Sequence, residues 1–290
     1  MNKKIKLSVE NVSKTFRIRG ATNGENGILP VLRHVNFDVY EGEIVSLIGE
    51  SVCGKTTLLR IGAGSGPPRC RHHQGGRAAS VTPRARPRLR VQQASLLPWR
   101  SARANVEFGL ELQGVRASER HRRADELLKL VGLGHAGGQF PHELSGGMQQ
   151  RIGLARALAI DPAIMLMDEP FSALDAQTRE VLQEELLRIQ REIGKTTLFV
   201  THDLDEVIYL SNRVVVLAAK PGRVKRVIDI PFELPRPPLT ELRGDPRFQA
   251  IRAGKRTARG SNWRSNGRSS SGSSPAASAW TNCSTRTPPA

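Results

Sequence analysis

The run of residues from Gly49 to Thr56, Gly-Glu-Ser-Val-Cys-Gly-Lys-Thr, restricts most strongly what this chain can fold into. It fits the pattern G-x-x-x-x-G-K-[ST]. The nearly continuous apolar run from Ile44 to Ile48 precedes it, which is typical of a strand buried on both faces. Residues 57–61 can begin a helix, whose positive end and free backbone N–H groups suit a bound phosphate. The alternative is a glycine-rich turn without a ligand, which the strand–loop–helix context disfavours.

The residue types in this loop and in a second acidic motif predict separate roles at a phosphate. Lys55 is expected to reach the β- and γ-phosphates of a nucleotide, and Thr56 to bind Mg²⁺. Residues 164–167 form an apolar run that ends in Asp168 and Glu169. At the carboxyl end of a strand, Asp168 is expected to hold Mg²⁺ through water, and Glu169 to polarise the attacking water. The alternative is a surface acidic pair at a strand end.

The hydrophobic pattern predicts strands that alternate with helices. We expect a helix over 119–131 with Ser118 as its N-cap, and one over 176–193 with Asp175 as N-cap and Gly194 beyond its end. Such alternation is typical of an α/β domain with a mainly parallel sheet. The expected strands cover residues 5–18, 31–39, 44–48, 163–167, 197–200 and 213–218.

The formal net charge of +17 would by itself suggest a nucleic acid or an anionic membrane as partner. However, residues 62–100 carry 8 basic and no acidic side chains, and residues 251–290 carry 7 and none. Folded domains usually mix both signs on their surface. The excess charge therefore marks two unusual segments rather than a binding face.

These two segments, residues 62–90 and 254–290, show neither a strand period nor a helix period. Their content of Arg, Gly, Pro and Ser predicts disorder, and the sheet would then lack partner strands at one edge. Cys70, His72 and His73 could suggest a metal site, but no fourth ligand is near.

The remaining composition excludes several classes of protein. No apolar run approaches the roughly 20 residues of a membrane span. The basic start is followed by no apolar stretch, so no signal peptide is expected. The cysteines are Cys53, Cys70 and Cys283, a wide spacing that argues against a disulfide framework and suits a reducing compartment.

Residues 144–150, Leu-Ser-Gly-Gly-Met-Gln-Gln, resemble the signature motif of ABC ATPases, the nucleotide-binding subunits of ABC transporters. Other motifs of that family follow in order, and the resemblance covers residues 5–61 and 91–250. It implies a P-loop NTPase core with a mainly parallel sheet, an antiparallel β subdomain and a helical subdomain over 101–160. Residues 1–250 would form this domain, with residues 251–290 as a basic Ser/Arg-rich tail.

The resemblance also implies the role of each site residue. Phe16 would stack on adenine, and Asp175 would belong to the D-loop. Gln92 would belong to the Q-loop and bind Mg²⁺, with Glu169 and His202 as its catalytic partners. The signature residues, which would cap the ATP held by a second subunit, are Ser145, Gly146, Gly147 and Gln149. The residues expected to bind ATP in the loop are Gly49, Glu50, Ser51, Val52, Cys53, Gly54, Lys55, Thr56 and Thr57.

Three of these assignments have plain alternatives. Phe16 could be an ordinary core aromatic, and His202 a histidine at a strand end. Gln93 could replace Gln92, although the spacing to Leu96-Leu97-Pro98-Trp99 favours Gln92.

Finer motifs, such as Lys220-Pro221-Gly222-Arg223-Val224, resemble importers of nitrate, sulfonate, taurine and related small anions. The resemblance implies ATP and Mg²⁺ as ligands, a homodimer of ATPase subunits, transmembrane permease subunits and, indirectly, a periplasmic or extracellular solute-binding protein. It places the chain peripherally at the cytoplasmic face of the inner membrane, with no nucleic acid partner. The alternatives are a soluble ABC ATPase that acts on nucleic acid, and a catalytically impaired subunit.

The sequence departs from the family pattern at two places. Val52 stands where these transporters usually have glycine; a β-branched residue at φ > 0 would cost about 1–3 kcal/mol. Residues 62–90 keep the family's length but lose its pattern, which suggests two compensating reading-frame slips, with a lineage-specific loop as the alternative. Translation of the gene in its other frames would decide between the two.

Overall fold

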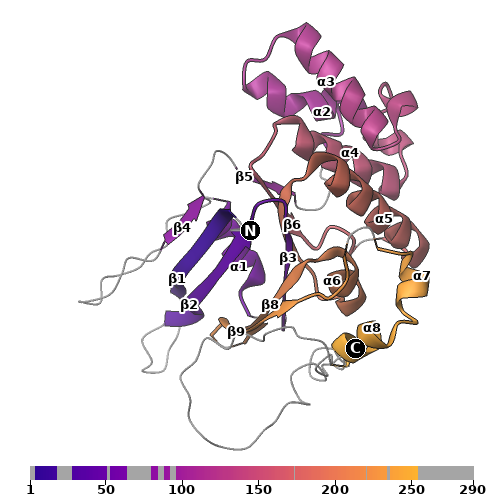
Figure 1. The fold of residues 1–290 in the computed structure, drawn as a ribbon. Helices are drawn as coiled ribbons and strands as arrows, with labels where there is room; N and C mark the ends of the chain where they lie inside the picture. The colour runs from indigo at the N-terminus through magenta and orange to yellow at the C-terminus, as the bar shows by residue number, and fades with distance from the viewer. Residues whose placement is uncertain are drawn as a thin grey trace, which may run out of the picture. The chain divides into compact units, whose positions relative to one another are not determined.

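The computed structural model describes residues 4–17, 28–50, 53–63, 80–83, 88–91, 96–172, 174–219, 221–233 and 236–253. The chain divides into two compact units (Figure 1). The first unit consists of residues 1–84 and 200–290, and the second of residues 85–199. Each is described by itself below.

An antiparallel sheet forms part of the first unit. Its order is β2 (Ile28–Tyr40), β1 (Ile5–Arg17) and β4 (Ser80–Pro83). Leu7, Val9 and Val12 of β1 are buried, and the ladder with β2 shifts register between Val9 and Val12. The two predicted N-terminal strands are therefore confirmed, as is their one-sided burial.

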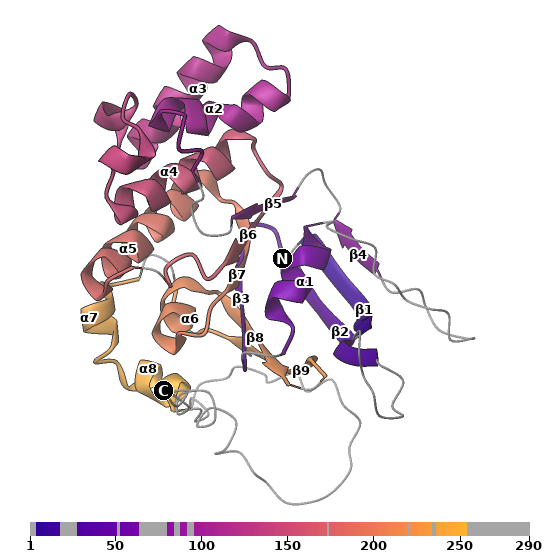
Figure 2. The same ribbon diagram turned by 180° about the vertical axis from the view of Figure 1, so that it is seen from behind.

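The first unit also holds the strand that leads into the glycine-rich loop. This strand, β3 (Ile44–Gly49), is buried along its whole length and pairs in parallel with β8 (Arg213–Ala218). β9 (Arg223–Asp229) pairs antiparallel with β8. The helices of this unit are α1 (Lys55–Gly62), α6 (Leu204–Leu210), α7 (Leu239–Leu242) and α8 (Pro246–Arg252). Figure 2 shows α1 beside β3, which it contacts.

The second unit combines parallel strands with helices. Its strands run in the order β5 (Arg88–Val91), β6 (Ile164–Asp168) and β7 (Thr196–Val200). Its helices are α2 (Ala102–Leu112), α3 (Ala117–Leu130), α4 (Gly146–Ala159) and α5 (Ala176–Ile193), with 3₁₀ turns η1 (Gly134–Ala136) and η2 (Pro141–Glu143). Helices α2, α3 and α4 pack on one another through fully buried side chains, among them Val106, Leu128 and Ile152. The mainly parallel α/β architecture is thus confirmed.

The caps predicted from the sequence are confirmed at α5 but not at α3. The Asp175 side chain accepts a hydrogen bond from the Thr178 N–H at 3.0 Å, and Gly194 ends α5 with φ 64°. The prediction that Ser118 caps α3 is wrong, because the N-cap is Arg116. Ser118 lies inside the first turn, where its backbone is already helical and its hydroxyl cannot cap the helix start.

The expectation that residues 62–90 contribute no strands is also wrong. β4 pairs antiparallel with residues 7–10 of β1, and β5 pairs in parallel with residues 164–167 of β6. A ladder uses backbone N–H and C=O groups, so a short segment can join a sheet edge without an alternating side-chain pattern. Residues 254–290, for which we expect disorder, lie outside the described residues, as do Cys70, His72 and His73.

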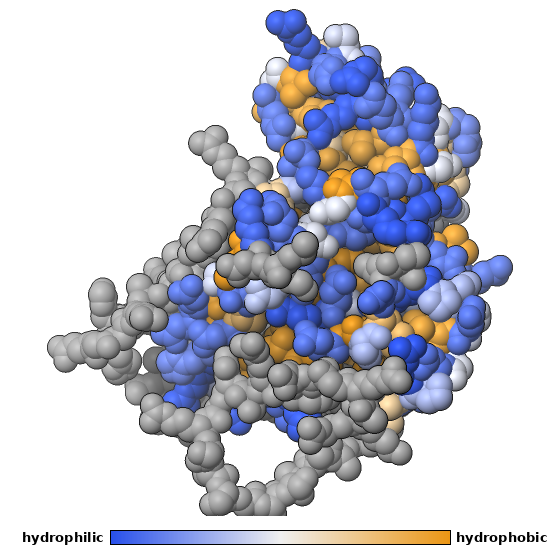
Figure 3. All heavy atoms as spheres, viewed as in Figure 1, coloured by the Kyte–Doolittle hydropathy of each residue, from blue (hydrophilic) through white to orange (hydrophobic). Residues whose placement is uncertain are grey.

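The surface of the helices α2 to α4 is mixed. Figure 3 shows apolar residues among hydrophilic ones over this part of the second unit. Trp99 and Leu112, both in this unit, are 72% and 74% exposed. Within the described residues, none of the helices combines the length and the apolar character that crossing a membrane requires.

Candidate active site

The glycine-rich loop places a buried lysine over its own backbone. Lys55 is the first residue of α1, and its Nζ donates to the carbonyl oxygens of Gly49 at 2.6 Å and of Glu50 at 3.0 Å. The same Nζ lies 3.8 Å from the Cys53 Sγ. Burial raises the pKa of the Cys53 thiol, so this thiol stays protonated and uncharged at neutral pH. An ammonium over a helix start suits a bound phosphate.

Two glycines of the loop are required by the backbone itself. Gly54 precedes α1 with φ 85°, a left-handed conformation that side chains rarely adopt. At Gly49, a Cβ atom would lie 2.6 Å from the carbonyl oxygen of Leu217 on β8. The motif's glycines are thus fixed by tight packing of the loop against β8 and by the turn into α1.

A third glycine, outside the motif, supports the loop from the side. A Cβ atom at Gly222 would lie 2.0 Å from the Cys53 carbonyl oxygen and 3.0 Å from that of Val31. The Gly222 N–H donates to Val31 at 2.8 Å, and the Gly222 carbonyl accepts from Arg33 N at 2.8 Å. The turn between β8 and β9 therefore packs against both β2 and the phosphate loop.

We expect Gly222→Ala to weaken ATP binding, because the added methyl must push the Cys53 carbonyl away. A displacement of about 1 Å in a positioned group can cost roughly 100-fold in activity. The measurement is the KM for ATP, which should rise at least tenfold. Gly244→Ala is the matched control, since its Cβ would lie 3.2 Å from Glu241 in a turn far along the chain. An unchanged KM in Gly222→Ala would show that the turn does not support the loop.

The predicted acidic pair lies at the end of β6 in the second unit. Asp168 is the last residue of the strand and is 8% exposed. Glu169 follows with φ 48°, a conformation that costs a non-glycine residue about 1–3 kcal/mol. Ser172 stabilises this turn, since its hydroxyl donates to the Glu169 carbonyl at 2.9 Å. The strained turn therefore sets the direction in which the Cα–Cβ bond of Glu169 leaves the strand end.

The signature residues form the start of α4. The Ser145 hydroxyl caps the helix by accepting from the Met148 N–H at 3.3 Å. A Cβ atom at Gly147 would lie 2.8 Å from the Thr178 methyl group, so this glycine also allows α4 and α5 to approach closely. Gln149 donates to the Pro141 carbonyl at 2.9 Å and to that of Leu144 at 3.2 Å, which fixes the loop before the helix. Gly146 is exposed.

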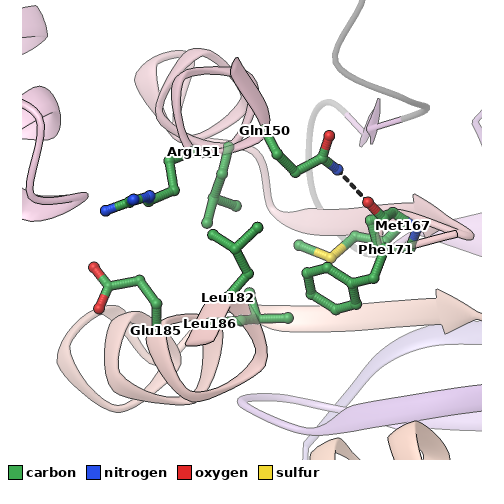
Figure 4. Close-up of a pocket in the computed structure, with 9 residues that line it drawn as sticks. Gln150, Arg151, Met167, Phe171, Leu182, Glu185 and Leu186 are labelled. Carbon is green, nitrogen blue, oxygen red and sulfur yellow. Dashed lines mark hydrogen bonds between the residues drawn. The ribbon is translucent and has the colours of Figure 1, made fainter. Parts of the chain in front are cut away.

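An apolar cavity lies behind this helix, among α4, β6 and α5 (Figure 4). Its volume is ≈ 20 Å³, enough for about one water molecule and too small for a nucleotide. Across its rim the Gln150 side chain donates to the Pro170 carbonyl, just after the acidic pair. The lining residues are Gln150, Arg151, Leu154, Met167, Pro170, Phe171, Leu182, Glu185 and Leu186. The cavity therefore belongs to the packing that connects α4 to the end of β6.

The other predicted residues lie at element ends or on the surface. Phe16 is 46% exposed on β1, with the Lys14 Nζ 5.5 Å from its ring centroid, so the alternative of a core aromatic is wrong. His202 is exposed between β7 and α6. The Asp175 pKa is lowered, first by the backbone hydrogen bond from Thr178, so this cap is lost only as the pH falls through that lowered value. Ser51, Val52 and Gln92 lie outside the described residues.

The described residues contain no group of three or more His, Cys, Asp and Glu side chains that could enclose a metal ion. Mg²⁺ needs no such group, because it keeps several waters and takes one or two oxygen ligands from the protein. The half-buried Thr56 hydroxyl in the first unit and the buried Asp168 carboxylate in the second each offer an oxygen atom of the type that Mg²⁺ prefers.

Comparison with known proteins agrees with this set of motifs. The family model "ABC transporter" matches residues 32–172. An uncharacterised ABC transporter ATP-binding protein of Methanocaldococcus jannaschii is 48% identical over 234 residues, which cover 80% of this chain and 85% of that protein. The chain belongs to the ABC transporter family. It is an ATP-binding subunit of that family, and it is an ATPase.

Among other relatives, the taurine import ATP-binding protein of Jannaschia sp. is 40% identical over 85% of this chain and 91% of that protein. The protein of that name from Rhizobium johnstonii is 48% identical over 78% and 84%. An ATP-binding cassette solved as a dimer in a post-hydrolysis state, bound to ADP and Pi, matches with a TM-score of 0.62 and 32% identity. That match covers 78% of this chain and all of the solved one.

Sequence reasoning missed the supporting role of Gly222. The segment Lys220-Pro221-Gly222 was visible, but only as a mark of the subfamily. Its contact with the phosphate loop links positions far apart in the chain, and no local pattern reveals such a contact. The sequence also did not reveal that Gly147 allows α4 to pack closely on α5, because this contact too joins separate helices.

Proposed function

We propose that this chain is the ATP-hydrolysing subunit of an importer for a small sulfonate such as taurine. The observation that carries the proposal is the similarity to taurine import ATP-binding proteins over almost their whole length. The same relatives favour transport over the alternative of an ATPase acting on nucleic acid. Nitrate and other sulfonates remain competing solutes within the same class of small anions.

In this proposal the loop and its surroundings hold the nucleotide. The exposed ring of Phe16 offers a stacking surface for adenine, and the Lys55 ammonium lies where phosphate oxygens would replace the loop's carbonyls as its partners. Thr56 and Asp168 would hold Mg²⁺, with Gln92 as a third ligand. When bound, the ion would supply positive charge beside the transferred phosphoryl group.

Hydrolysis is assigned to Glu169, His202 and Gln92. Glu169 is held at a strained turn after the Asp168 strand end, as a base that orients the attacking water would require. His202 is exposed at a strand end, where it can reach a substrate. Two copies would pair head to tail, with Ser145, Gly146 and Gly147 of one copy and Asp175 of its D-loop facing the ATP of the other. The solved relative that is dimeric with ADP and Pi supports this pairing.

The partner of the ATPase dimer would be a pair of transmembrane permease subunits. Trp99 and Leu112 of the second unit are exposed. Their apolar side chains offer this unit a surface for contact with the permease. Such a complex places the chain peripherally at the cytoplasmic face of the inner membrane. A solute-binding protein outside the cell would deliver the substrate to the permease.

The test is ATP-driven uptake in membrane vesicles that contain this chain together with candidate permease subunits and a candidate solute-binding protein from the same organism. We expect uptake of labelled taurine that requires ATP and is lost in Lys55→Ala. Labelled nitrate and an alkanesulfonate are measured in parallel. Uptake of either of these in place of taurine would refute the assignment of the solute, and ATP hydrolysis without uptake of any anion would refute the role in import.

A further inference from the structure

The short helix α6, which follows His202, is held at its C-terminal end by one buried arginine. Arg236 is 8% exposed, and its guanidinium donates to the carbonyl oxygens of Ile208 at 2.8 Å, of Ser211 at 2.6 Å, and of Tyr209. A fourth bond at 3.2 Å goes to Phe232 in its own segment. Burial lowers the Arg236 pKa to about 10, so the guanidinium remains charged at neutral pH.

These bonds supply what α6 lacks by itself. The last carbonyls of any helix have no partner within the helix, and a seven-residue helix is marginal in isolation. A cation near the C-terminal end is also favoured by the helix dipole. The planar fork of an arginine can reach several carbonyls at once, which the single ammonium of a lysine cannot.

The same end of α6 is joined to the strand that carries the phosphate loop. The Ser211 hydroxyl is hydrogen-bonded to that of Ser46 in the middle of β3, and both side chains are fully buried. Asn212 and Ile44 exchange two further hydrogen bonds of 2.8 Å at the start of β3. The C-terminal end of α6, whose carbonyls Arg236 holds, is therefore connected through Ser211 and Asn212 to the buried strand β3.

At the N-terminal end of α6, hydrogen bonds hold the residues on either side of His202. The Thr201 hydroxyl donates to the buried Glu206 carboxylate at 2.6 Å and accepts from the Asp203 N–H at 3.1 Å. The Asp203 carboxylate caps α6 by accepting from the N–H groups of Asp205 at 2.8 Å and of Glu206 at 3.3 Å. The neighbours of His202 on both sides are thus tied to the first turn of α6.

A second contact links α6 to the C-terminal segment. The Asp205 carboxylate pairs with Arg243 Nε and with Arg252 Nε, each at 3.0 Å. Figures 1 and 2 both show α8, which carries Arg252, beside α6. Residues 236–252 therefore hold α6 at its N-terminal turn as well as at its C-terminal end.

We propose that Arg236 is a positioning residue for His202, acting through α6: it fixes the C-terminal end of the helix whose first turn fixes the backbone on both sides of the histidine. The proposal rests on the role assigned to His202 in hydrolysis. Loss of the Arg236 guanidinium allows α6 to shift, and His202 shifts with the helix. The phosphate loop keeps its own contacts. The effect therefore falls on kcat and leaves the KM for ATP unchanged.

The experiment measures kcat, KM and thermal stability for Arg236→Met and Arg236→Lys in the full chain. Arg236→Met keeps most of the side-chain volume but no donor, and kcat should fall roughly 10- to 100-fold. Arg236→Lys should restore part of that loss, since an ammonium can hold some of the carbonyls. Arg247→Lys is the matched control, because Arg247 pairs with Asp245 in the same segment, and its kcat should stay at the wild-type value.

Two comparisons keep the test decisive. If Arg236→Met does not fold, Arg236→Lys alone should show a lowered kcat at wild-type KM, and a wild-type kcat there overturns the proposal. In a His202→Ala background, Arg236→Met should lower kcat no further, whereas a further loss by the same factor shows a general structural role. A wild-type kcat in His202→Ala would refute the role of the histidine in hydrolysis. A lowered kcat in His202→Ala, with wild-type kcat in the Arg236 variants, would refute only the positioning role of Arg236.

Discussion

Replacement Glu169→Gln should slow ATP hydrolysis by roughly 100-fold or more while ATP still binds. The amide has the size of the carboxylate but cannot accept a proton from the attacking water. The turn that holds this side chain, with φ 48° and the Ser172 hydrogen bond, does not depend on the charge and should persist. The measurement is single-turnover hydrolysis of bound ATP.

The same variant should accumulate as an ATP-bound dimer, because hydrolysis is the step that would separate the copies. Size-exclusion chromatography with and without ATP would show the change in mass. Glu184→Gln is the matched control, since Glu184 lies exposed on α5 and should leave both readouts at the wild-type level. Normal turnover in Glu169→Gln would remove this residue from the role of base.

The second large effect is expected for Lys55→Ala. The buried ammonium is held by the carbonyls of Gly49 and Glu50, so its loss removes the charge that phosphate oxygens would meet and leaves the loop less ordered. We expect hydrolysis to fall about 100- to 1,000-fold, comparable to the loss of a donor at a developing charge. Nucleotide binding should be measured separately with a fluorescent ATP analogue.

Lys225→Ala tests whether this effect is specific. Lys225 is exposed on β9 of the same unit, so its loss removes the same charge from the chain without touching the loop. Its activity should remain at the wild-type level. Equal losses in the two variants would indicate that net charge, not the position over the loop, determines activity.

The motifs could be predicted because each one is local. Gly49, Gly54 and Lys55 lie within one strand–loop–helix unit, where the backbone conformation follows from neighbours in the chain. Asp175 as a cap and Gly194 as a helix end are also local, and the structure confirms both. Ser118 is not the cap, because α3 already begins at Ala117 and Ser118 lies inside its first turn.

Residues 62–90 show where composition misleads. Their content predicts neither β4 nor β5, yet both short strands pair with neighbours whose own pattern is strong. The backbone of an existing strand is sufficient for this pairing. The role of Val52 in nucleotide affinity stays a prediction, as does the frame-slip hypothesis, which only the gene's other reading frames can test.

The sequence by itself determined the family, the phosphate loop and the order of strands and helices, because these depend on short spacings and on periodicity. The tertiary structure alone decided which distant residues support them. Gly222 is pressed against Cys53, and Arg236 lies on the last carbonyls of α6. Both contacts join positions far apart in the chain, and their free energy arises only when folding excludes water and brings the two segments together.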